Sequence, residues 1–404
     1  MLLNHLSSSF LSCSDNDEKD AFIFSIFLEI LIELFKTWFK SLLYQTFARP
    51  IFFRMDAEEA HNYTMDWGKR VNESNFLKWL ANSLFFYENP ILGQTIDGIY
   101  FPNPIGIAAG FDKNAQIIEA LEAIGLGFIE VGSITALPSK GNPKPRAFRL
   151  EKDKALINRM GLNNQGAIEI CHRLQSHPCN IPLGVNVAKT HDPSILGDKA
   201  IEDYQQSFKQ AQKVADYLTL NISCPNTEEG KTFEDEAALT ELLHALLKTE
   251  KQVTQPVYVK FSVDLTQEPL QKLVQLCLDF GVTGFVATNT SNSRDGLKSD
   301  AAKLNEIGRG GLSGAPLAQR STQIIKWIRE ASEGKKTIIG VGGIDSEKSA
   351  LDKIEAGADL LQLYTGLVFQ GPSLIKKINR AIADKMDREG ATAIRSLKNP
   401  VIGV

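Results

Sequence analysis

Eight short apolar runs, separated by segments with helical periodicity, occupy the chain from about residue 100 onward. Such an alternation of strands and helices is typical of a parallel sheet, because each parallel strand needs a helix-length connection to reach the next one. Eight units of this kind predict an α/β fold, the (β/α)8 TIM barrel. The predicted strands cover residues 106–110, 128–133, 183–187, 217–222, 257–261, 285–290, 337–342 and 360–364.

The barrel does not account for the whole chain. A barrel of this type takes about 250 residues, and the chain has 404. We predict a polar, disordered lead over residues 1–20, amphipathic helices over 21–88, the barrel over 89–390 and a C-terminal tail over 391–404. The first 20 residues lack the basic start and small-residue cleavage site of a signal peptide.

Residues 21–44 are rich in Phe, Ile and Leu but carry one narrow polar stripe. Ser25, Glu29, Glu33, Lys36 and Lys40 fall at spacings that place them on one face of a helix. A membrane-spanning helix tolerates carboxylates poorly, so the pattern favours a helix that lies in the membrane interface. A helix in a protein core or an oligomer interface shows the same periodicity and stays open as an alternative.

Two further helices are predicted before the barrel, over residues 57–70 and 75–85. Asp56, followed three residues later by Glu59, has the spacing of an N-terminal cap for the first of them. Together with residues 21–44 these helices would form a small apolar entrance to the barrel, or would plug one of its ends.

Composition excludes several classes of function. The net charge is -4 and 23% of the residues are charged, so the chain offers no basic field for a nucleic acid. The five cysteines are odd in number and lack Cys-x-x-Cys spacing, which suits a reducing cytoplasm. His172 and His177 come closest to metal-ligand spacing, but five residues apart on a helix they point to different faces. We predict no metal site.

Each predicted strand ends in a residue that can contact a ligand. In a barrel these residues converge on the C-terminal face, where the active site lies. They are Gly110 with Asp112 and Lys113, Ser133, Asn186 with Lys189, Asn221, Lys260, Thr288 with Asn289, Gly342 with Gly343, and Tyr364 with Thr365.

The kinds of residue at this face indicate the kind of ligand. Glycine turns at 340–344 and 364–366 follow the last two strands, where backbone amides and a helix N-terminus bind anions, so we expect a cofactor phosphate there. Lys260 would favour an anionic cofactor ring, and Lys113 would neutralise a substrate carboxylate. Side-chain amides each offer a donor and an acceptor, which suits a pyrimidine-like ring. The candidates are Asn158, Asn221, Asn226 and Asn289.

Seven motifs carry a family resemblance. Over about residues 42–380 the chain resembles the dihydroorotate dehydrogenases, specifically their membrane-associated, quinone-dependent class. The motifs are AAGFDKN at 108–114, GNPKPRAFR at 141–149, INRMGLNN at 157–164, NISCPNT at 221–227, ATNT at 287–290, GGLSG at 310–314 and GVGGI at 340–344.

The resemblance implies a set of site residues around FMN and dihydroorotate. It places at the flavin Ala109, Gly110, Ser133, Asn186, Asn221, Lys260, Thr288, Gly314, Gly343, Tyr364 and Thr365. It places at the pyrimidine Lys113, Asn158, Arg159, Met160, Gly161, Leu162, Asn221, Asn226, Asn289 and Thr290.

The resemblance also implies a catalytic base, at Cys224. The quinone-dependent class has a serine at this position, whereas cysteine is the choice of the soluble class. A thiol has an ordinary pKa of about 8.5, so it accepts a proton more readily than a serine hydroxyl. Assignment to the quinone class therefore rests on the N-terminal helices and on residues 141–149.

The resulting hypothesis is oxidation of dihydroorotate to orotate in pyrimidine biosynthesis. Cys224 would remove the C5 proton, FMN would accept the C6 hydride, and a membrane quinone would take the electrons. We expect a peripheral protein on the cytoplasmic side of a membrane, a bacterial inner membrane. The alternatives are a soluble fumarate-dependent enzyme of the same family, an FMN-dependent tRNA-dihydrouridine synthase, and a non-catalytic membrane-bound scaffold.

Overall fold

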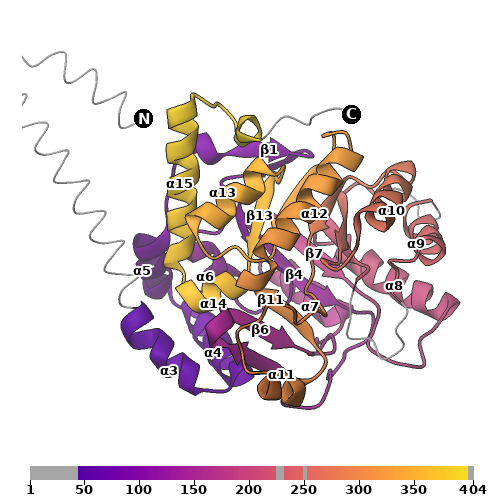
Figure 1. Ribbon diagram of the computed structural model, residues 1–404, viewed down its shortest axis with the longest axis horizontal. Helices are drawn as coiled ribbons and strands as arrows, with labels where there is room; N and C mark the ends of the chain where they lie inside the picture. The colour runs from indigo at the N-terminus through magenta and orange to yellow at the C-terminus, as the bar shows by residue number, and fades with distance from the viewer. Residues whose placement is uncertain (1–43, 224–231, 249–252, 399–404) are drawn as a thin grey trace, which may run out of the picture. The chain divides into compact units, whose positions relative to one another are not determined.

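The computed structural model describes residues 44–223, 232–248 and 253–398 (Figure 1). The chain divides into two compact units, residues 1–51 and 52–404. The described part of the first unit contains the π-helix Tyr44–Ala48 and the start of α3 (Arg49–Arg54). The predicted interfacial helix over 21–44 lies almost wholly outside the described residues. Within the described ranges, no helix is both long and apolar enough to cross a membrane.

The second unit contains a closed barrel of eight parallel strands, which confirms the predicted fold class (Figure 1). Around the barrel the strands follow the order β10-β12-β13-β3-β4-β7-β8-β9. Their bounds are β3 Ile105–Ile107, β4 Phe128–Ile134, β7 Leu183–Val187, β8 Tyr217–Asn221, β9 Val257–Phe261, β10 Gly284–Ala287, β12 Thr337–Val341 and β13 Leu360–Leu363.

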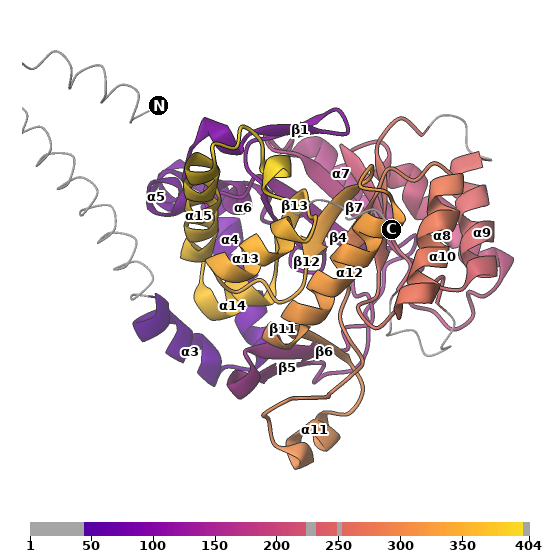
Figure 2. The same cartoon turned by 45° about the horizontal axis from the view of Figure 1, so that its top comes forward.

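The strands read as apolar runs because helices cover the outside of the barrel while side chains fill its inside. Every residue of β4, β7, β9 and β12 is buried. Figures 1 and 2 show the helices arranged around the strands. The surrounding helices include α6 Ile118–Ala123, α7 Ala167–Ser176, α8 Asp198–Ala211, α9 Glu236–Leu243, α10 Gln267–Asp279, α12 Ala318–Ala331, α13 Glu347–Glu355, α14 Thr365–Gln370 and α15 Ser373–Glu389.

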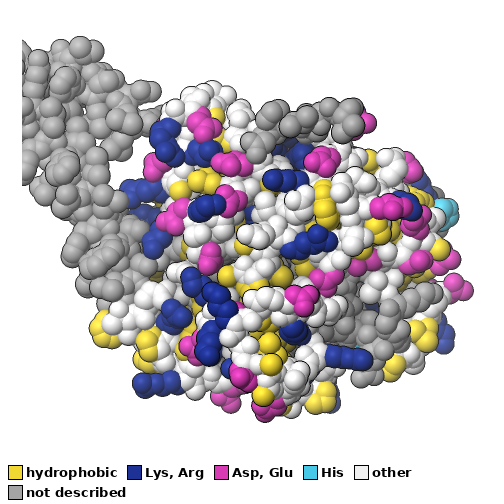
Figure 3. Space-filling view, in the orientation of Figure 1, with side chains coloured by type: hydrophobic (Ala, Val, Ile, Leu, Met, Phe, Trp, Pro, Cys, Tyr) yellow, Lys and Arg dark blue, Asp and Glu magenta, His cyan; other side chains and the backbone are white. Residues whose placement is uncertain are grey.

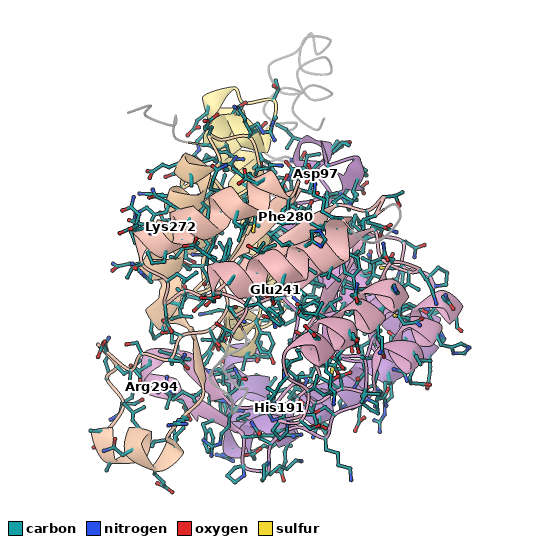
Figure 4. All side chains as sticks on the ribbon, turned by 90° about the vertical axis from the view of Figure 1, so that its right-hand side faces the viewer. Asp97, His191, Glu241, Lys272, Phe280 and Arg294 are labelled. Carbon is teal, nitrogen blue, oxygen red and sulfur yellow. The ribbon has the colours of Figure 1, made fainter. Side chains whose placement is uncertain are left out.

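A two-stranded hairpin closes the amino-terminal end of the barrel. Strands β1 (Gln94–Ile96) and β2 (Ile99–Phe101) pair antiparallel, and Phe101 packs edge-on against Phe128 in the barrel interior. Asp97 at the hairpin turn accepts a 2.7 Å hydrogen bond from Tyr258. In Figure 4, Asp97 lies at one end of the molecule, and His191 and Arg294 lie towards the other. The ligand-binding mouth is therefore at the end away from the hairpin.

The two predicted helices before the barrel are present as α4 (Ala57–Glu73) and α5 (Asn75–Phe85). Asp56 caps α4 by accepting a hydrogen bond from the Glu58 amide at 2.8 Å. Helix α4 lies close to the barrel because Gly68 has no side chain: a Cβ there would lie 2.6 Å from Ile117. These helices cover the side of the barrel at α6, while the hairpin plugs its end.

A small antiparallel sheet, not predicted from the sequence, stands beside the barrel mouth. It has the order β11-β6-β5, with β5 Ala147–Leu150, β6 Ala155–Asn158 and β11 Gly311–Gly314. In Figure 2 this sheet lies between the barrel and α11 (Ala301–Ile307). Its strands end at Asn158 and Gly314, two of the predicted site residues.

Candidate active site

A cavity of about 1120 Å³, which includes the part open to solvent, lies at the carboxyl ends of the barrel strands. Its wall brings together most of the residues singled out from the sequence. Of the predicted cofactor residues it contains Ala109, Gly110, Ser133, Asn221, Lys260, Thr288, Gly314, Gly343, Tyr364 and Thr365. Of the predicted substrate residues it contains Lys113, Asn158, Met160, Leu162, Asn221, Asn289 and Thr290.

The remaining predicted residues do not line this cavity or lie outside the described residues. Arg159 stacks its guanidinium over the ring of Phe148, 4.6 Å from its centroid. Gly161 lies against Asn142: a Cβ on this glycine would be 2.6 Å from the backbone nitrogen of Asn142. Asn186 is buried behind the wall, where its side chain is hydrogen-bonded to Ser133, which lines the cavity, and to Glu130. Cys224 and Asn226 lie outside the described residues, and their roles stay predictions.

A buried carboxylate, Glu130 in β4, organises the floor of the site. Its oxygens accept hydrogen bonds from Asn186 at 2.9 Å, Gln362 at 2.7 Å and Thr219 at 3.1 Å. Burial lowers the pKa of Lys260 on the neighbouring floor of the cavity, and the negative charge of Glu130 opposes that shift. The carboxylate therefore helps to keep a cation facing the cavity.

A chain of hydrogen bonds fixes the polar groups that face the ligand space. Ser133 donates to the side-chain oxygen of Asn186 and accepts from the amide of Asn221 at 3.0 Å. The amide of Asn289 donates both to Asn221 and to Ser223, each at 3.1 Å. Because neighbours hold each amide, its rotamer is set before a ligand binds, which lowers the entropy cost of binding.

Lys113 is a second lysine in the wall of the cavity. Burial lowers its pKa to about 8, and the charge of Arg146 adds to that shift, while Glu58 and Asp112 oppose it. A carboxylate bound there would stabilise the charged form.

Glycines shape the part of the cavity that lies against β11, β12 and α14. Gly343 has a φ of +72°, and a Cβ on it would lie 2.4 Å from the backbone nitrogen of Ala318. A Cβ on Gly366 would lie 2.0 Å from the carbonyl oxygen of Ile344. Only glycine allows the backbone to approach so closely, and such turns expose amide donors to an anion.

Thr288 adds a buried hydroxyl that could form a hydrogen bond with a ligand. Its hydroxyl is buried in the cavity wall and has no hydrogen-bond partner within the described part of the chain. Buried hydroxyls are normally paired, so a partner from a bound molecule is the natural explanation. With the glycine turns, the cation at Lys260 and the row of amides, the wall fits a planar, phosphate-bearing cofactor such as FMN.

The helix α4 is connected to the site by an ion pair and by edge-to-face ring contacts. Glu58 and Arg146 are both buried and lie 2.8 Å apart. Burial would raise the pKa of Glu58, but the hydrogen bonds and charge of Arg146, together with Lys144, hold it below its ordinary value. The ring of His61 packs on Phe111 at 5.4 Å, and Phe111 packs on Tyr364 in the cavity wall at 5.6 Å.

Comparison with known proteins assigns the family. The family model described as dihydroorotate dehydrogenase matches residues 91–386, which span all eight barrel strands. The chain belongs to the dihydroorotate dehydrogenase family. This assignment confirms the resemblance carried by the seven motifs.

Curated relatives within the dihydroorotate dehydrogenase family match this chain over nearly their whole length. "Dihydroorotate dehydrogenase (quinone)" of Roseiflexus sp. is 40% identical over 349 residues, which are 86% of this chain and 95% of that protein. The protein of the same name from Christiangramia forsetii is 40% identical over 345 residues, or 85% of this chain and 99% of the relative. That from Natronomonas pharaonis is 41% identical, over 87% of this chain and 97% of the relative.

Solved structures within the dihydroorotate dehydrogenase family share the fold. The crystal structure of the Eimeria tenella enzyme in complex with ferulenol matches with a TM-score of 0.73 and 30% identity, covering 84% of this chain and 94% of that one. The ligand-free form matches with a TM-score of 0.71 and 32% identity, over 80% and 96% of the two chains.

Sequence reasoning missed Glu130 and Gln362, which hold the floor of the site together. Both carry a signal that was available: a charged or amide side chain inside an otherwise apolar, fully buried strand needs a partner. A second signal was the position of each within its strand, because alternate residues of a barrel strand point inward.

Proposed function

We propose that this protein is a quinone-dependent dihydroorotate dehydrogenase that oxidises dihydroorotate to orotate in pyrimidine biosynthesis, with FMN as cofactor. The observation that carries the proposal is the cavity at the barrel mouth. Its wall contains two lysines, a row of ordered amides, and the glycines Gly314, Gly342, Gly343 and Gly366, which we call the glycine cradle. The names of the curated relatives support the same reaction and the same class of electron acceptor.

FMN, when bound, supplies the acceptor for the hydride that leaves the substrate. The glycines Gly314 and Gly343 would accommodate its phosphate, and Lys260 would stabilise negative charge on its ring. These roles follow from the shape and charge of the wall. The protein thereby contributes position and electrostatics to chemistry that belongs to the cofactor.

The substrate would lie against the amides and Lys113. Asn221 and Asn289, already held by hydrogen bonds, offer donors and acceptors to the edge of a pyrimidine ring. Lys113 would pair with the substrate carboxylate. Cys224, three residues after Asn221 in the sequence, would take the C5 proton as a base of suitable pKa.

Membrane association is supported by the exposed face of α4 and α5. Four aromatic side chains there expose 43% to 65% of their surface. They are Tyr63, Trp67, Phe76 and Trp79. A group of exposed apolar side chains is typical of a surface that binds a protein or a membrane. The rings of His61, Phe111 and Tyr364, in edge-to-face contact, lead from α4 to the cavity, so a quinone held at these helices would be near the flavin site. We therefore place the protein peripherally on a membrane surface.

The charge distribution opposes the nucleic-acid alternative. Figure 3 shows Lys and Arg interspersed with Asp and Glu over the face in view, without one continuous basic field. A tRNA-modifying enzyme needs a basic surface along the path of the nucleic acid. The soluble fumarate-dependent class keeps one specific point in its favour, which is the cysteine at position 224.

Visible spectroscopy of the purified protein tests the proposal. The protein should be yellow, and dihydroorotate added without oxygen should bleach the flavin band. A quinone should then restore the band faster than fumarate does. A folded but colourless protein would refute the cofactor assignment, and faster reoxidation by fumarate would move the protein to the soluble class.

A further inference from the structure

Lys353 of α13 is a lysine that none of the roles above explains. Its side chain is fully buried, on the outer side of the barrel. Its ammonium donates hydrogen bonds to Ser321 at 2.5 Å, to Thr322 at 3.1 Å and to the carbonyl of Ala318 at 3.3 Å. In the described ranges no carboxylate forms an ion pair with it. A buried ammonium without a counter-ion costs stability, so its retention calls for a reason.

The three acceptors of Lys353 all belong to the first turn and a half of α12, the segment that supports the glycine cradle. Gly343 packs directly on the backbone of Ala318. The hydroxyl of Ser321, which accepts from Lys353, lies 2.8 Å from the carbonyl oxygen of Gly342 and 2.9 Å from that of Leu317 in its own helix, so these two acceptors share its single proton. A continuous path of two hydrogen bonds therefore joins the buried ammonium to the turn that lines the cavity.

This path determines where an amide donor points. In a planar trans peptide the C=O and the following N–H point in opposite directions. Ser321 holds the carbonyl of Gly342 on the helix side, so the N–H of Gly343 is directed away from α12. Both glycines line the cavity. The hydrogen bond from Lys353 polarises the Ser321 hydroxyl, and this strengthens its donation to Gly342.

We propose that Lys353 is a positioning residue for the cofactor phosphate, acting through Ser321 and the Gly342 peptide. This inference rests on the proposed function, because it takes the glycine cradle to be the phosphate site of FMN. In its charged form Lys353 also places a positive charge behind that cradle, in surroundings where water does not screen it. Burial lowers the pKa of Lys353 to about 7, against the effect of Asp352, and an anion in the cradle would favour its charged form.

The test compares FMN with riboflavin, which has the same ring system but no phosphate. Full-length protein freed of flavin is titrated with each compound, and binding is followed by quenching of flavin fluorescence. Lys353→Met should weaken FMN binding by about tenfold or more, the scale of one lost hydrogen bond to a charged group, and should leave riboflavin binding nearly unchanged. Lys348→Met is the matched control, because Lys348 lies on the same helix but is 83% exposed.

Ser321→Ala provides a second, independent arm. It keeps the ammonium and removes the link to Gly342, so it should also weaken FMN binding selectively, and it decides the question alone if Lys353→Met fails to fold. An equal loss for FMN and riboflavin, or no loss for either, would overturn the proposal by reducing Lys353 to a packing role. A wild-type protein that binds neither flavin would instead refute the proposed function.

Discussion

At the scale of single residues, the charged groups of the site depend on neighbours that no ligand touches. Burial lowers the pKa of Lys260 in the cavity wall, and the charge of Glu130 offsets part of this effect. Lys113 sits between one repelling cation, Arg146, and two attracting carboxylates. The pKa of each lysine therefore depends on burial and on the neighbouring charges. Substituting one of these charged neighbours should alter ligand binding although the neighbour does not touch the ligand.

Lys113 makes orotate binding sensitive to pH. Its pKa, about 8, is depressed from the ordinary value, so the free protein loses this charge as the pH rises through 8. Pairing with the orotate carboxylate needs the charged form. We expect the dissociation constant of orotate to rise above pH 8, approaching about tenfold per pH unit.

Isothermal titration from pH 6 to pH 10 measures this dependence. Lys113→Met should bind orotate more weakly at pH 7, and its affinity should no longer change between pH 7 and pH 9 beyond the change that the ligand itself causes. A wild-type dissociation constant that stays flat across this range would show that Lys113 does not pair with the carboxylate.

Cys224 should matter for flavin reduction more than for binding. We expect Cys224→Ala to slow the reduction of FMN by dihydroorotate by about 100-fold or more, the usual contribution of a positioned base, while orotate still binds. Cys224→Ser should retain part of the activity with its pH optimum moved upward, because a hydroxyl holds its proton more tightly than a thiol. Stopped-flow absorbance measures both rates.

Cys179→Ala is the control for the loss of a thiol. Cys179 lies between α7 and β7, away from the cavity wall, and burial raises its pKa to about 11. This variant should reduce its flavin at the wild-type rate. Equal rates in Cys224→Ala and the wild type would mean that another group, or water, removes the proton.

At the scale of elements, one buried ion pair fastens α4 to the loop before β5. Glu58 contacts Arg146, whose guanidinium also donates to the carbonyls of Lys140 and Asn142. Removing one partner of a buried pair leaves the other uncompensated, which costs about 3 kcal/mol. We expect Glu58→Gln to lower the free energy of unfolding by about this amount at pH 7.

The pH dependence of this loss identifies the ion pair as its cause. The pKa of Glu58 is lowered in the folded protein, so the pair stabilises the fold above the unfolded-state pKa of about 4.3 and loses this effect as the pH falls through the lower folded value. The difference between Glu58→Gln and wild type, from urea titrations, should therefore shrink in acid. Glu59→Gln, on the exposed face of α4, should show no difference at either pH.

The elements that the sequence predicted are those with a local signal. Barrel strands such as β9 are buried on both faces and therefore appear as unbroken apolar runs. The sheet β11-β6-β5 was not predicted because its strands are far apart in the sequence. Leu156 pairs with Ser313, for example, and neither segment alone indicates this pairing. The hairpin β1–β2 had a signal that was overlooked: its turn, Asp97-Gly98, has positive φ at both residues, as Asp-Gly turns do.

The site was predictable to the extent that motifs fix which residues meet, but not which way each one faces. Asn158, Met160 and Leu162 line the cavity, whereas Arg159 and Gly161 do not. After β6 ends at Asn158 the chain turns, with positive φ at Gly161 and Leu162, so a motif assigned as a block includes residues that point away from the cavity. Interactions between residues far apart in the sequence, such as the effect of Glu130 on the pKa of Lys260, could be identified only from the closed barrel.

At the scale of the whole molecule, the helices before the barrel belong to two different environments. Met65 of α4 and Leu92 of the 3-10 helix Pro90–Leu92 are part of the main core, so removing the chain up to about residue 100 would expose that core. The opposite face of the same helices carries the exposed rings. Membrane binding is therefore better tested by changing these rings than by truncation.

Phe76 and Trp79 form the outermost pair, with ring centroids 5.9 Å apart and more than 60% of each side chain exposed. Burying one such side chain in a bilayer contributes about 1.5 to 3 kcal/mol, so the double variant Phe76→Ser/Trp79→Ser should bind liposomes at least about tenfold more weakly. Because both rings are exposed, the melting temperature should stay nearly constant. Ile168→Ser, on the exposed face of α7 with 71% exposure, is the matched control.

Liposome flotation measures binding. Turnover with a long-chain quinone embedded in the liposomes should fall in parallel with binding, while single-turnover bleaching of the flavin by dihydroorotate stays unchanged. Unaltered flotation and quinone turnover in the double variant would show that another part of the chain meets the membrane.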